Sequence, residues 1–515
     1  MTVTALHFEL PENLTATKFL NKLSKKVDFQ IASQQYTIKS LYDSFDWRLY
    51  SADIVCEFNH SQSASRLNLK NRKSGELIAS EDIQDIPAFS EYFSEGRLKS
   101  ELEDKLEMRA LLPICHLPYE AYLINILNKD NKTVLRVQID QYEFLGNTVN
   151  LLPLKGYEKA VRNISHLLQK TFEFKPADNT VLNAALKQQG QKAKDYSSKL
   201  TIKLKPEMRA DVASKVIYQH LLQIMKVNEA GTIDNTDSEF LHDFRVAVRR
   251  TRSGFNQIKN TLPAKTIAEH ADFFAWLGQI TGLTRDLDVY LLSYKDYQQA
   301  LPISLREDIT PLHDFLKEKQ QLAQQELAKK LRSSDYINQL TAWEDYLNSP
   351  LPKKNKESNA SMSIKALADQ RIWKSYKRLL KEAGAITDAS PAKGLHDLRK
   401  TCKKLRYLIE FFQSLYPSED IKVILKSMKG FQNILGDFQD YEIQELKIKQ
   451  FSEEMMASNV PSNTFLAMGV LVQYLDSMKC KAREGFSCQF TQLKQVENQN
   501  LFIKLFTSKA QEKKA

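Results

Sequence analysis

An internal repeat with a spacing of 154 residues is the feature that most constrains the fold. The segment LHDFRVAVRRTR begins at Leu241, and LHDLRKTCKKLR begins at Leu395. The same spacing relates two downstream positions, Gly282 to Gly436 and Asp286 to Asp440. Two separate segments that share one spacing without drift predict a duplicated unit whose helices have equal lengths. We therefore expect two homologous helical bundles that face each other about a pseudo-two-fold axis.

The rest of the chain divides into a β-rich start and a helical remainder. Helical periodicity continues from Pro206 onward, interrupted by the polar stretch 349–363. Short β-rich runs and turn signals, including a hairpin turn over 129–132, fill the first 150 residues. The predicted strands are Gln35–Leu41, Ile54–Phe58, Arg66–Lys70, Tyr122–Leu127 and Thr133–Ile139, and the predicted helices beside them are Leu14–Lys26 and Gly156–Thr171. The fold class is therefore α+β.

Polar, weakly patterned segments set the expected domain boundaries. We expect an N-terminal domain with trailing helices over 1–186 and a linker over 187–200. A helical domain follows over 201–510, with the first copy at about 201–348 and the second at about 364–510. The final eight residues, 508–515, are expected to be a frayed tail.

Composition excludes several classes of protein. The 15 glycines and 15 prolines are too few for collagen-like or low-complexity chains. No apolar run reaches the length of a transmembrane helix, and the first residues lack the basic and apolar regions of a secretory signal. The five cysteines form no C-x-x-C pair, which favours buried thiols in a reducing cytoplasm and argues against a zinc site. We expect a cytoplasmic protein.

The charge is unevenly distributed along the chain. The first 150 residues hold 17 basic and 21 acidic side chains, a net charge of −4, whereas the remainder holds 56 and 42, a net charge of +14. Such asymmetry predicts a polyanionic partner for the C-terminal part.

The two repeated segments have the pattern of amphipathic helices with one cationic side. On a wheel of about 100° per residue, Arg245, Arg249 and Arg252 lie within about 80° of His242. Apolar positions lie opposite, and the second segment repeats the pattern from His396. Start signals at 236–239 and 390–391 place each histidine in the first two helical turns, where free amides favour an anion.

The clustering itself points to an anionic ligand. Like charges at these spacings repel by a few tenths of a kcal/mol per pair, and the pattern occurs twice in register. Arginine forks suit phosphate oxygens, and lysines add point charges. Few aromatic side chains interleave with the basic side, so base stacking has little support, and a repeating phosphate chain fits better than single-stranded nucleic acid.

These segments resemble the CHAD family (conserved histidine α-helical domain) over roughly 200–510. The resemblance implies a pair of four-helix bundles around a basic channel that binds inorganic polyphosphate. The implied polyphosphate contacts are His242, Arg245, Arg249, Arg250, Arg252 and Arg285, and, in the second copy, His396, Arg399, Lys403, Lys404 and Arg406. Asp243 and Asp397 are expected to orient basic neighbours or support the helix start. Arg285 has a neutral counterpart, Gln439.

The first 150 residues are similar to CYTH domains, the triphosphate tunnel family. The resemblance rests on LYDSFDWRLYSADIV (41–55), RLNLKNRKSGE (66–76), RALLPI (109–114) and NKDNKTVLRVQID (128–140). It implies an antiparallel β-tunnel that acts on triphosphates with a divalent metal. The E-x-E-x-K signature of that family is replaced by Val3, Ala5 and His7, which removes metal ligands, so we expect a domain without catalytic residues. Glu101 and Glu103 are expected to be a solvated surface rather than a metal-site remnant.

The predicted function is binding of inorganic polyphosphate, with polyphosphate granules as a further candidate partner and no membrane association. No cofactor is expected, and Mg²⁺ or Mn²⁺ enters only if the CYTH-like domain is active. Two alternatives stay open: a metal-dependent triphosphate or polyphosphate hydrolase, and a nucleic-acid-binding protein.

Overall fold

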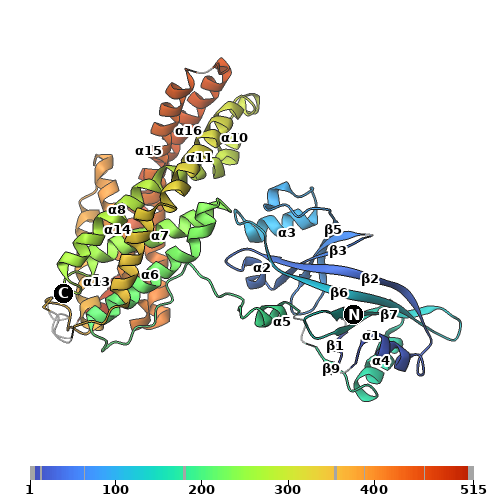
Figure 1. Ribbon diagram of the computed structural model, residues 1–515. Helices are drawn as coiled ribbons and strands as arrows, with labels where there is room; N and C mark the ends of the chain where they lie inside the picture. The colour runs from blue at the N-terminus through green and yellow to red at the C-terminus, as the bar shows by residue number, and fades with distance from the viewer. Residues whose placement is uncertain are drawn as a thin grey trace. The chain divides into compact units, whose positions relative to one another are not determined.

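The computed structural model describes residues 6–507 apart from 12–13, 63, 178–180, 353–355, 388 and 458. The chain separates into two compact units, Met1–Ser197 and Ser198–Ala515 (Figure 1). Val3 and Ala5 of the replaced signature and the tail 508–515 lie outside the described residues.

The N-terminal unit is built on one curled antiparallel sheet. Its strand order is β5-β4-β3-β2-β6-β7-β8-β1-β9, and every neighbouring pair is antiparallel. The strands are β1 (Leu6–Glu9), β2 (Phe29–Asp43), β3 (Ile54–Ser61), β4 (Ser65–Asn71), β5 (Leu77–Asp82), β6 (Leu112–Leu127), β7 (Thr133–Tyr142), β8 (Thr148–Pro153) and β9 (Lys175–Pro176). The five predicted strands and the antiparallel α+β class are confirmed.

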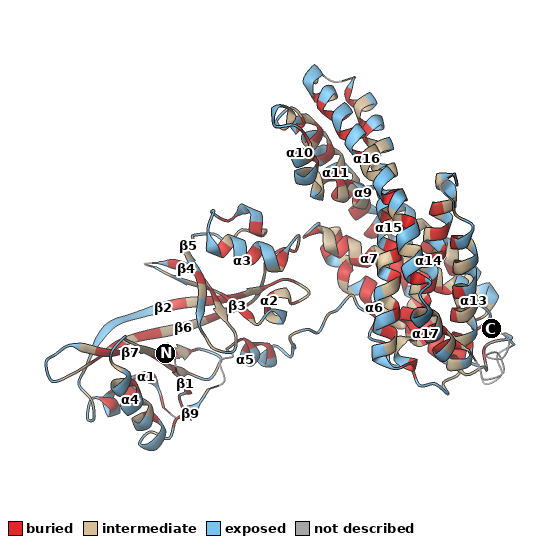
Figure 2. Cartoon of the chain, turned by 180° about the vertical axis from the view of Figure 1, so that it is seen from behind, coloured by how far each residue is buried: buried red, intermediate tan, exposed pale blue. Residues whose placement is uncertain are grey.

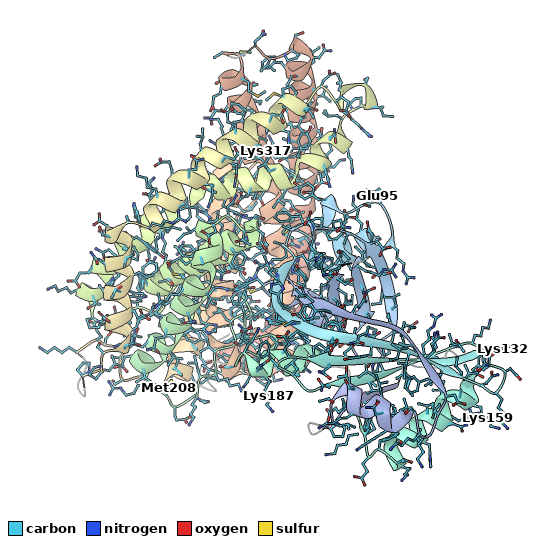
Figure 3. The ribbon with its side chains drawn as sticks, turned by 45° about the vertical axis from the view of Figure 1, so that its right-hand side comes forward. Glu95, Lys132, Lys159, Lys187, Met208 and Lys317 are labelled. Atoms are coloured by element: carbon cyan, nitrogen blue, oxygen red, sulfur yellow. The ribbon has the colours of Figure 1, made fainter. Side chains whose placement is uncertain are left out.

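The alternation of side chains along β7 gives this strand one apolar and one polar side. In β7, Leu135, Val137 and Ile139 are buried in a core that includes residues of α1 (Ala16–Leu23) and α4 (Glu158–Lys170). β6 and β7 join through the predicted hairpin turn, where Asn128 donates its backbone N–H to the carbonyl of Lys132 at 3.0 Å (Figure 3).

Three further helices cover other parts of the sheet. The short α2 (Arg48–Ser51) and α3 (Arg97–Leu106) enclose a second apolar core with β3, β4 and β5. α5 (Val181–Gln188) contributes Leu182, Ala185 and Leu186 to a third core, with residues of β2 and β6. The expected linker 187–200 is partly engaged by this unit, because Lys187 and Gln188 close α5 and Asp195 accepts a 2.9 Å hydrogen bond from Trp47 Nε1.

The C-terminal unit is helical throughout. The first copy comprises α6 (Ala210–Ile233), α7 (Ser238–Gln257), α8 (Ala264–Ile280), α9 (Gly282–Leu292), α10 (Tyr294–Ala300), α11 (Thr310–Leu331) and α12 (Ser334–Asn348). The second comprises α13 (Ile364–Gly384), α14 (Ala392–Phe412), α15 (Ser418–Met455), α16 (Ser462–Leu493) and α17 (Val496–Phe506). α6, α7 and α8 begin 154 residues before α13, α14 and α15, respectively, so the predicted duplication extends to helix starts.

Backbone hydrogen bonds between the copies are reciprocal where α6 and α13 begin. Ala210 donates its N–H to the carbonyl of Met362 at 2.9 Å, and Ile364 donates to the carbonyl of Met208 at 2.8 Å. Residues 208 and 210 of the first copy correspond to residues 362 and 364 of the second, so exchanging the copies turns each of these two hydrogen bonds into the other. A local two-fold relation between the copies requires such an exchange. The symmetry of the complete bundles stays a prediction.

The apolar cores are shared between the copies rather than confined to one copy each. The larger core joins residues of α6, α7, α8 and α12 with residues of α13, α14, α15 and α17. A second core joins α9, α10 and α11 with the C-terminal half of α15 and the N-terminal half of α16. Figure 2 shows buried residues interspersed with exposed ones along α15 and α16, as expected for helices with one apolar side.

Two smaller observations bear on the class of protein. Among the described residues, no helix is both long and apolar enough to cross a lipid bilayer. Cys56, Cys115 and Cys402 are buried thiols as expected, whereas Cys480 and Cys488 are exposed on α16, so the expectation of burial was wrong for these two.

Candidate anion-binding site

The two cationic helices, α7 and α14, pack against each other and carry most of the predicted ligand contacts. α7 begins after Asp237, whose side chain accepts hydrogen bonds from the N–H groups of Glu239 and Phe240. The start signal predicted at 236–239 therefore caps this helix, through its second residue, Asp237. α14 begins at Ala392 after Pro391 in extended conformation, one residue later than predicted, and Ser390 provides no cap.

The environment of the first arginine of each motif repeats at the spacing of 154 residues. A Cβ added to Gly282 would lie 3.8 Å from Arg245 Nη1, and one added to Gly436 would lie 3.8 Å from Arg399 Nε. Each glycine therefore lies beside the equivalent arginine, at a distance where a Cβ would make an ordinary van der Waals contact.

The last arginine of each motif also has an equivalent neighbour. Arg406 donates from Nη1 to Gln432 Oε1 at 2.9 Å. The residue equivalent to Gln432 is Gly278, and a Cβ there would lie 2.6 Å from Nη1 of Arg252. Arg252 and Arg406 therefore lie in equivalent places against α8 and α15.

Several predicted contacts already have partners within the protein. Arg250 is buried and donates to Glu410 Oε2 at 2.7 Å, and Arg406 donates to Oε1 of the same carboxylate at 2.6 Å. Glu410 thus joins one arginine from each copy. Because Arg250 is paired with this buried carboxylate, we leave it out of the residues proposed to contact a ligand.

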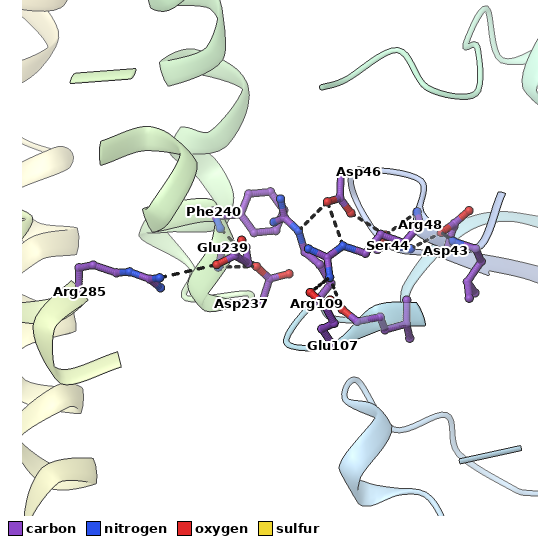
Figure 4. A network of polar contacts seen from close by, with 12 residues as sticks. Asp43, Ser44, Asp46, Arg48, Glu107, Arg109, Asp237, Glu239, Phe240 and Arg285 are labelled. Atoms are coloured by element: carbon purple, nitrogen blue, oxygen red, sulfur yellow. Dashed lines mark hydrogen bonds and ion pairs between the residues drawn. The ribbon is translucent and has the colours of Figure 1, made fainter. Parts of the chain in front are cut away.

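Two further predicted residues pair with acidic side chains. Arg285 Nη2 lies 3.8 Å from Glu239 Oε1, and its Nη1 donates to the carbonyl of Ser238 at 3.2 Å (Figure 4). His396 Nε2 lies 2.5 Å from Glu442 Oε2. Arg285 and His396 therefore take part in polar contacts near the starts of α7 and α14, respectively.

The first arginines are partly satisfied. Arg245 donates from Nη1 to Thr281 Oγ1 at 2.8 Å, and burial together with Arg249 lowers the pKa of Arg245 to about 10. Arg399 donates to Gln439 Oε1 and to Asp440 Oδ1, each at 3.2 Å. The hydrogen bonds of Arg245 go to neutral acceptors, and the nearby charges of Asp286 and Asp288 compensate its guanidinium only in part.

Arg249 and Lys403 form the centre of the site. They are equivalent residues of the two copies, both half-buried, and neither has a carboxylate within ion-pairing distance in the described part of the chain. Burial, with the positive charges of Arg399 and Arg249, lowers the pKa of Lys403 to about 8. The two charges are therefore close enough to repel each other, and an anion between them would relieve that repulsion.

The remaining predicted residues lie around this centre. His242 is half-buried in the first turns of α7, whereas Arg252 and Lys404 are exposed. Asp397 accepts a hydrogen bond from Lys400 at 3.0 Å, which agrees with the expectation that it orients a basic neighbour.

Sequence reasoning missed the contacts of two acidic residues, Glu410 and Asp288. Glu410 was not expected to bridge the arginines, and Asp288 was not singled out. Burial raises the pKa of Asp288 to about 6, although Gln320 donates a 2.9 Å hydrogen bond to it. Burial also raises the pKa of Asp286, which the positive charge of Arg245 partly offsets. The repeat could have indicated Asp288, because Glu442 stands 154 residues after it.

The polar side of the N-terminal sheet compensates its own charges. Lys70 donates to Glu57 Oε2 at 2.6 Å, and Lys39 donates to the Tyr142 hydroxyl at 2.7 Å with Asp140 at 3.7 Å. Burial would raise the pKa of Glu57, but Lys70 and Lys39 lower it to about 2. These carboxylates are therefore held as counter-ions of lysines.

His7, Glu101 and Glu103 do not form a metal site. His7 contacts Asn150 Oδ1 through Nδ1 at 2.5 Å, and Glu101 and Glu103 lie on α3, where Glu103 is exposed and Glu101 half-buried. Within residues 6–507, outside the gaps named above, no group of three or more His, Cys, Asp or Glu side chains could hold a metal ion. The residues present do not fit a divalent metal, so we derive no reaction step through one.

The loop before α2 contains a separate polar network. Arg48 Nε donates to Asp46 Oδ2 at 3.1 Å, and Arg109 Nε lies 3.3 Å from the same oxygen (Figure 4). Burial raises the pKa of Asp46, but Arg109 and Arg48 lower it overall. This network fixes the turn 46–49 (Asp-Trp-Arg-Leu), which belongs to the segment 41–55 used for the CYTH resemblance.

The helical unit is duplicated and carries two equivalent cationic helices, and one family model matches this part of the chain. Residues 216–448 match the family model described as the CHAD domain. Residues 216–448 are therefore similar to CHAD domains, as the repeated motif predicted.

Individual relatives are distant. Two uncharacterized proteins from Mycobacterium tuberculosis strains are 24% identical over 290 residues, which cover 56% of this chain and 54% of theirs. The chain thus spans about half the length of the curated relatives it matches. The crystal structure of the CHAD domain from Ricinus communis has 22% identity and a TM-score of 0.49, covering 57% of this chain and 96% of that one. For the N-terminal part, a Hippeastrum protein with a reported triphosphatase activity has 11% identity and a TM-score of 0.28, covering 38% of this chain and 99% of that one.

Proposed function

We propose that the helical unit binds inorganic polyphosphate between α7 and α14 without cleaving it. The observation that carries the proposal is the pair Arg249 and Lys403, two half-buried cations at equivalent positions without a carboxylate partner among the described residues. Placing such charges together costs free energy in the absence of an anion. A bound phosphate chain supplies the missing negative charge.

The surrounding side chains suit a chain of phosphates. Arg245 and Arg399 lie one helical turn before the central pair, and a turn rises about 5.4 Å along each helix. Guanidinium groups bind phosphate oxygens through paired N–H donors. Successive turns can therefore contact successive phosphates of one chain.

A bare phosphate polymer accounts for the site better than nucleic acid does. Within α7 and α14 the cationic positions are not interleaved with exposed aromatic side chains on which bases could stack. A local two-fold relation between the copies also suits a polymer without chain direction, whereas each nucleic-acid strand has one. Competition at fixed salt tests this choice. Displacement of polyphosphate by RNA or single-stranded DNA at equal phosphate concentration would count against the proposal.

We expect the N-terminal unit to lack hydrolytic activity. Glu57 and Asp140 are engaged by lysines, and the described residues provide no metal site. Incubation with tripolyphosphate and Mg²⁺ or Mn²⁺ should release no phosphate above background. Phosphate release by the wild type that is lost in Glu57→Gln would contradict this expectation and support the hydrolase alternative.

Charge reversal at the centre of the site tests the binding proposal. The double variant Arg249→Glu with Lys403→Glu should lose at least 100-fold in affinity for long-chain polyphosphate, about the 2.7 kcal/mol expected for two lost charge-assisted contacts. The control is Lys265→Glu with Lys422→Glu, which makes the same change in net charge at exposed positions of α8 and α15. Equal losses in both double variants would show that only net charge matters and would remove the basis for the site.

A further inference from the structure

The central pair of the site differs in one chemical respect. Arg249 carries a guanidinium, which stays protonated at any physiological pH, whereas its equivalent, Lys403, carries an amine that can release its proton. Both side chains are half-buried on packed helices. The copies are therefore equivalent in position but not in their response to pH.

Charged groups from three helices surround the Lys403 amine. On α14 itself, Arg399 and Arg406 lie one turn to either side, and α7 contributes Arg249. The acidic side chain that faces it is Asp440 of α15, which already accepts a hydrogen bond from Arg399. The surroundings are therefore mainly cationic, and burial adds to their effect. Together they lower the pKa of Lys403 to about 8 in the free protein.

We propose that anion binding at this site is coupled to proton uptake by Lys403, so that the affinity for polyphosphate falls as the pH rises from 7 to 9. The inference rests on the proposed function and adds its regulation by pH. A phosphate chain beside Lys403 supplies negative charge where the free protein has a surplus of positive charge. The charged amine is favoured in the complex for that reason.

The sign and size of the effect follow from linkage. When a ligand favours the protonated form of a group, its affinity falls as the group loses its proton in the free protein. At pH 9, about one tenth of the free protein would carry a charged Lys403, so the affinity should be about tenfold lower than at pH 7. Terminal phosphates of the ligand gain negative charge over the same range, which acts in the opposite direction. Long chains minimise that contribution because most of their phosphates are internal.

Isothermal titration calorimetry with long-chain polyphosphate at pH 8, in two buffers of different protonation enthalpy, measures the protons taken up. The full-length wild type should take up about half a proton per site and lose about tenfold in affinity from pH 7 to pH 9. Lys403→Arg keeps the positive charge but cannot release it, so this variant should bind at pH 7 and show neither effect. Lys422→Arg, at an exposed position of α15 outside the predicted contacts, is the matched control and should behave as the wild type.

The outcomes separate this inference from the proposed function. Wild-type binding without proton uptake, or proton uptake that persists in Lys403→Arg, would overturn the inference and leave the binding function standing. Failure of the wild type to bind polyphosphate at pH 7 would overturn both.

Discussion

Arg250 of α7 and Glu410 of α14 form a buried ion pair at 2.7 Å that joins the two copies of the duplicated unit. Arg406 contacts the other oxygen of the same carboxylate at 2.6 Å, so Glu410 compensates two arginines at once. The position equivalent to Glu410 in the first copy is Asn256. The copies are therefore joined by an interaction that is not itself duplicated.

Glu410→Gln should destabilise the helical unit by about 3 kcal/mol, because it leaves two guanidinium groups without their counter-ion. Urea denaturation followed by the fluorescence of Trp276, Trp343 and Trp373 would measure the loss. Glu419→Gln, at an exposed pair with Lys422, is the control and should change the free energy of unfolding by less than about 0.5 kcal/mol. Similar values for both variants would show that the buried pair contributes no more than a surface one.

Gly254→Ala tests how closely α6 and α7 pack. A Cβ at this position would lie 2.8 Å from Cε1 of Tyr218, a buried ring that also packs against Trp343. The substitution should lower the free energy of unfolding by about 2 kcal/mol, since the ring has no space to move into. Gly469→Ala provides the contrast, because a Cβ there meets no atom within 4 Å. Its effect should be a gain of about 0.5–1 kcal/mol from the higher helix propensity of alanine, and destabilisation by both variants to the same extent would refute the packing argument.

Asp288→Asn should stabilise the protein in a pH-dependent manner. Burial raises the pKa of Asp288 to about 6 in the folded state, above its value in the unfolded chain. The folded state therefore holds a proton that the unfolded chain has lost between these two values, and wild-type stability falls as the pH rises through that window. The variant should gain about 3 kcal/mol at pH 7 and only about 0.5 kcal/mol at pH 4. Denaturation at the two pH values tests this, with exposed Asp314→Asn as the control. A gain in the free energy of unfolding that is the same at both pH values would contradict the raised pKa of Asp288.

The salt dependence of binding should report the number of phosphate contacts. For nucleic acids, each phosphate contact that is lost reduces the slope of log affinity against log salt concentration by about one unit. We expect a similar reduction for Arg249→Ala with polyphosphate and none for Lys265→Ala, which lies on an exposed part of α8. A slope that is unchanged in Arg249→Ala would argue that this residue does not contact the ligand.

The sequence predicted the features that depend on local pattern and on the duplication. Five strands of the N-terminal sheet, β2, β3, β4, β6 and β7, were predicted from local pattern, whereas β1, β5, β8 and β9 were not. The starts of α6, α7 and α8 recur in the second copy because the spacing has no drift. The position of Lys403 opposite Arg249 also follows from the repeat once the two helices pack together.

Partners that depend on tertiary packing could not be predicted. Arg250 was expected to face a ligand, but its side chain is buried and donates a hydrogen bond to Glu410 of α14. A helical wheel places a residue on an arc and does not show which neighbouring helix covers it. In the same way, the carboxylates of Glu57 and Asp140 were not expected to be neutralised by Lys70 and Lys39, because these residues come from four different strands.

A structure of the full-length protein with a medium-length polyphosphate bound tests the central claim most directly. We predict phosphate density between α7 and α14, with oxygen atoms within hydrogen-bonding distance of both Arg249 and Lys403. Density confined to other basic surfaces, with the central pair unoccupied, would contradict the account.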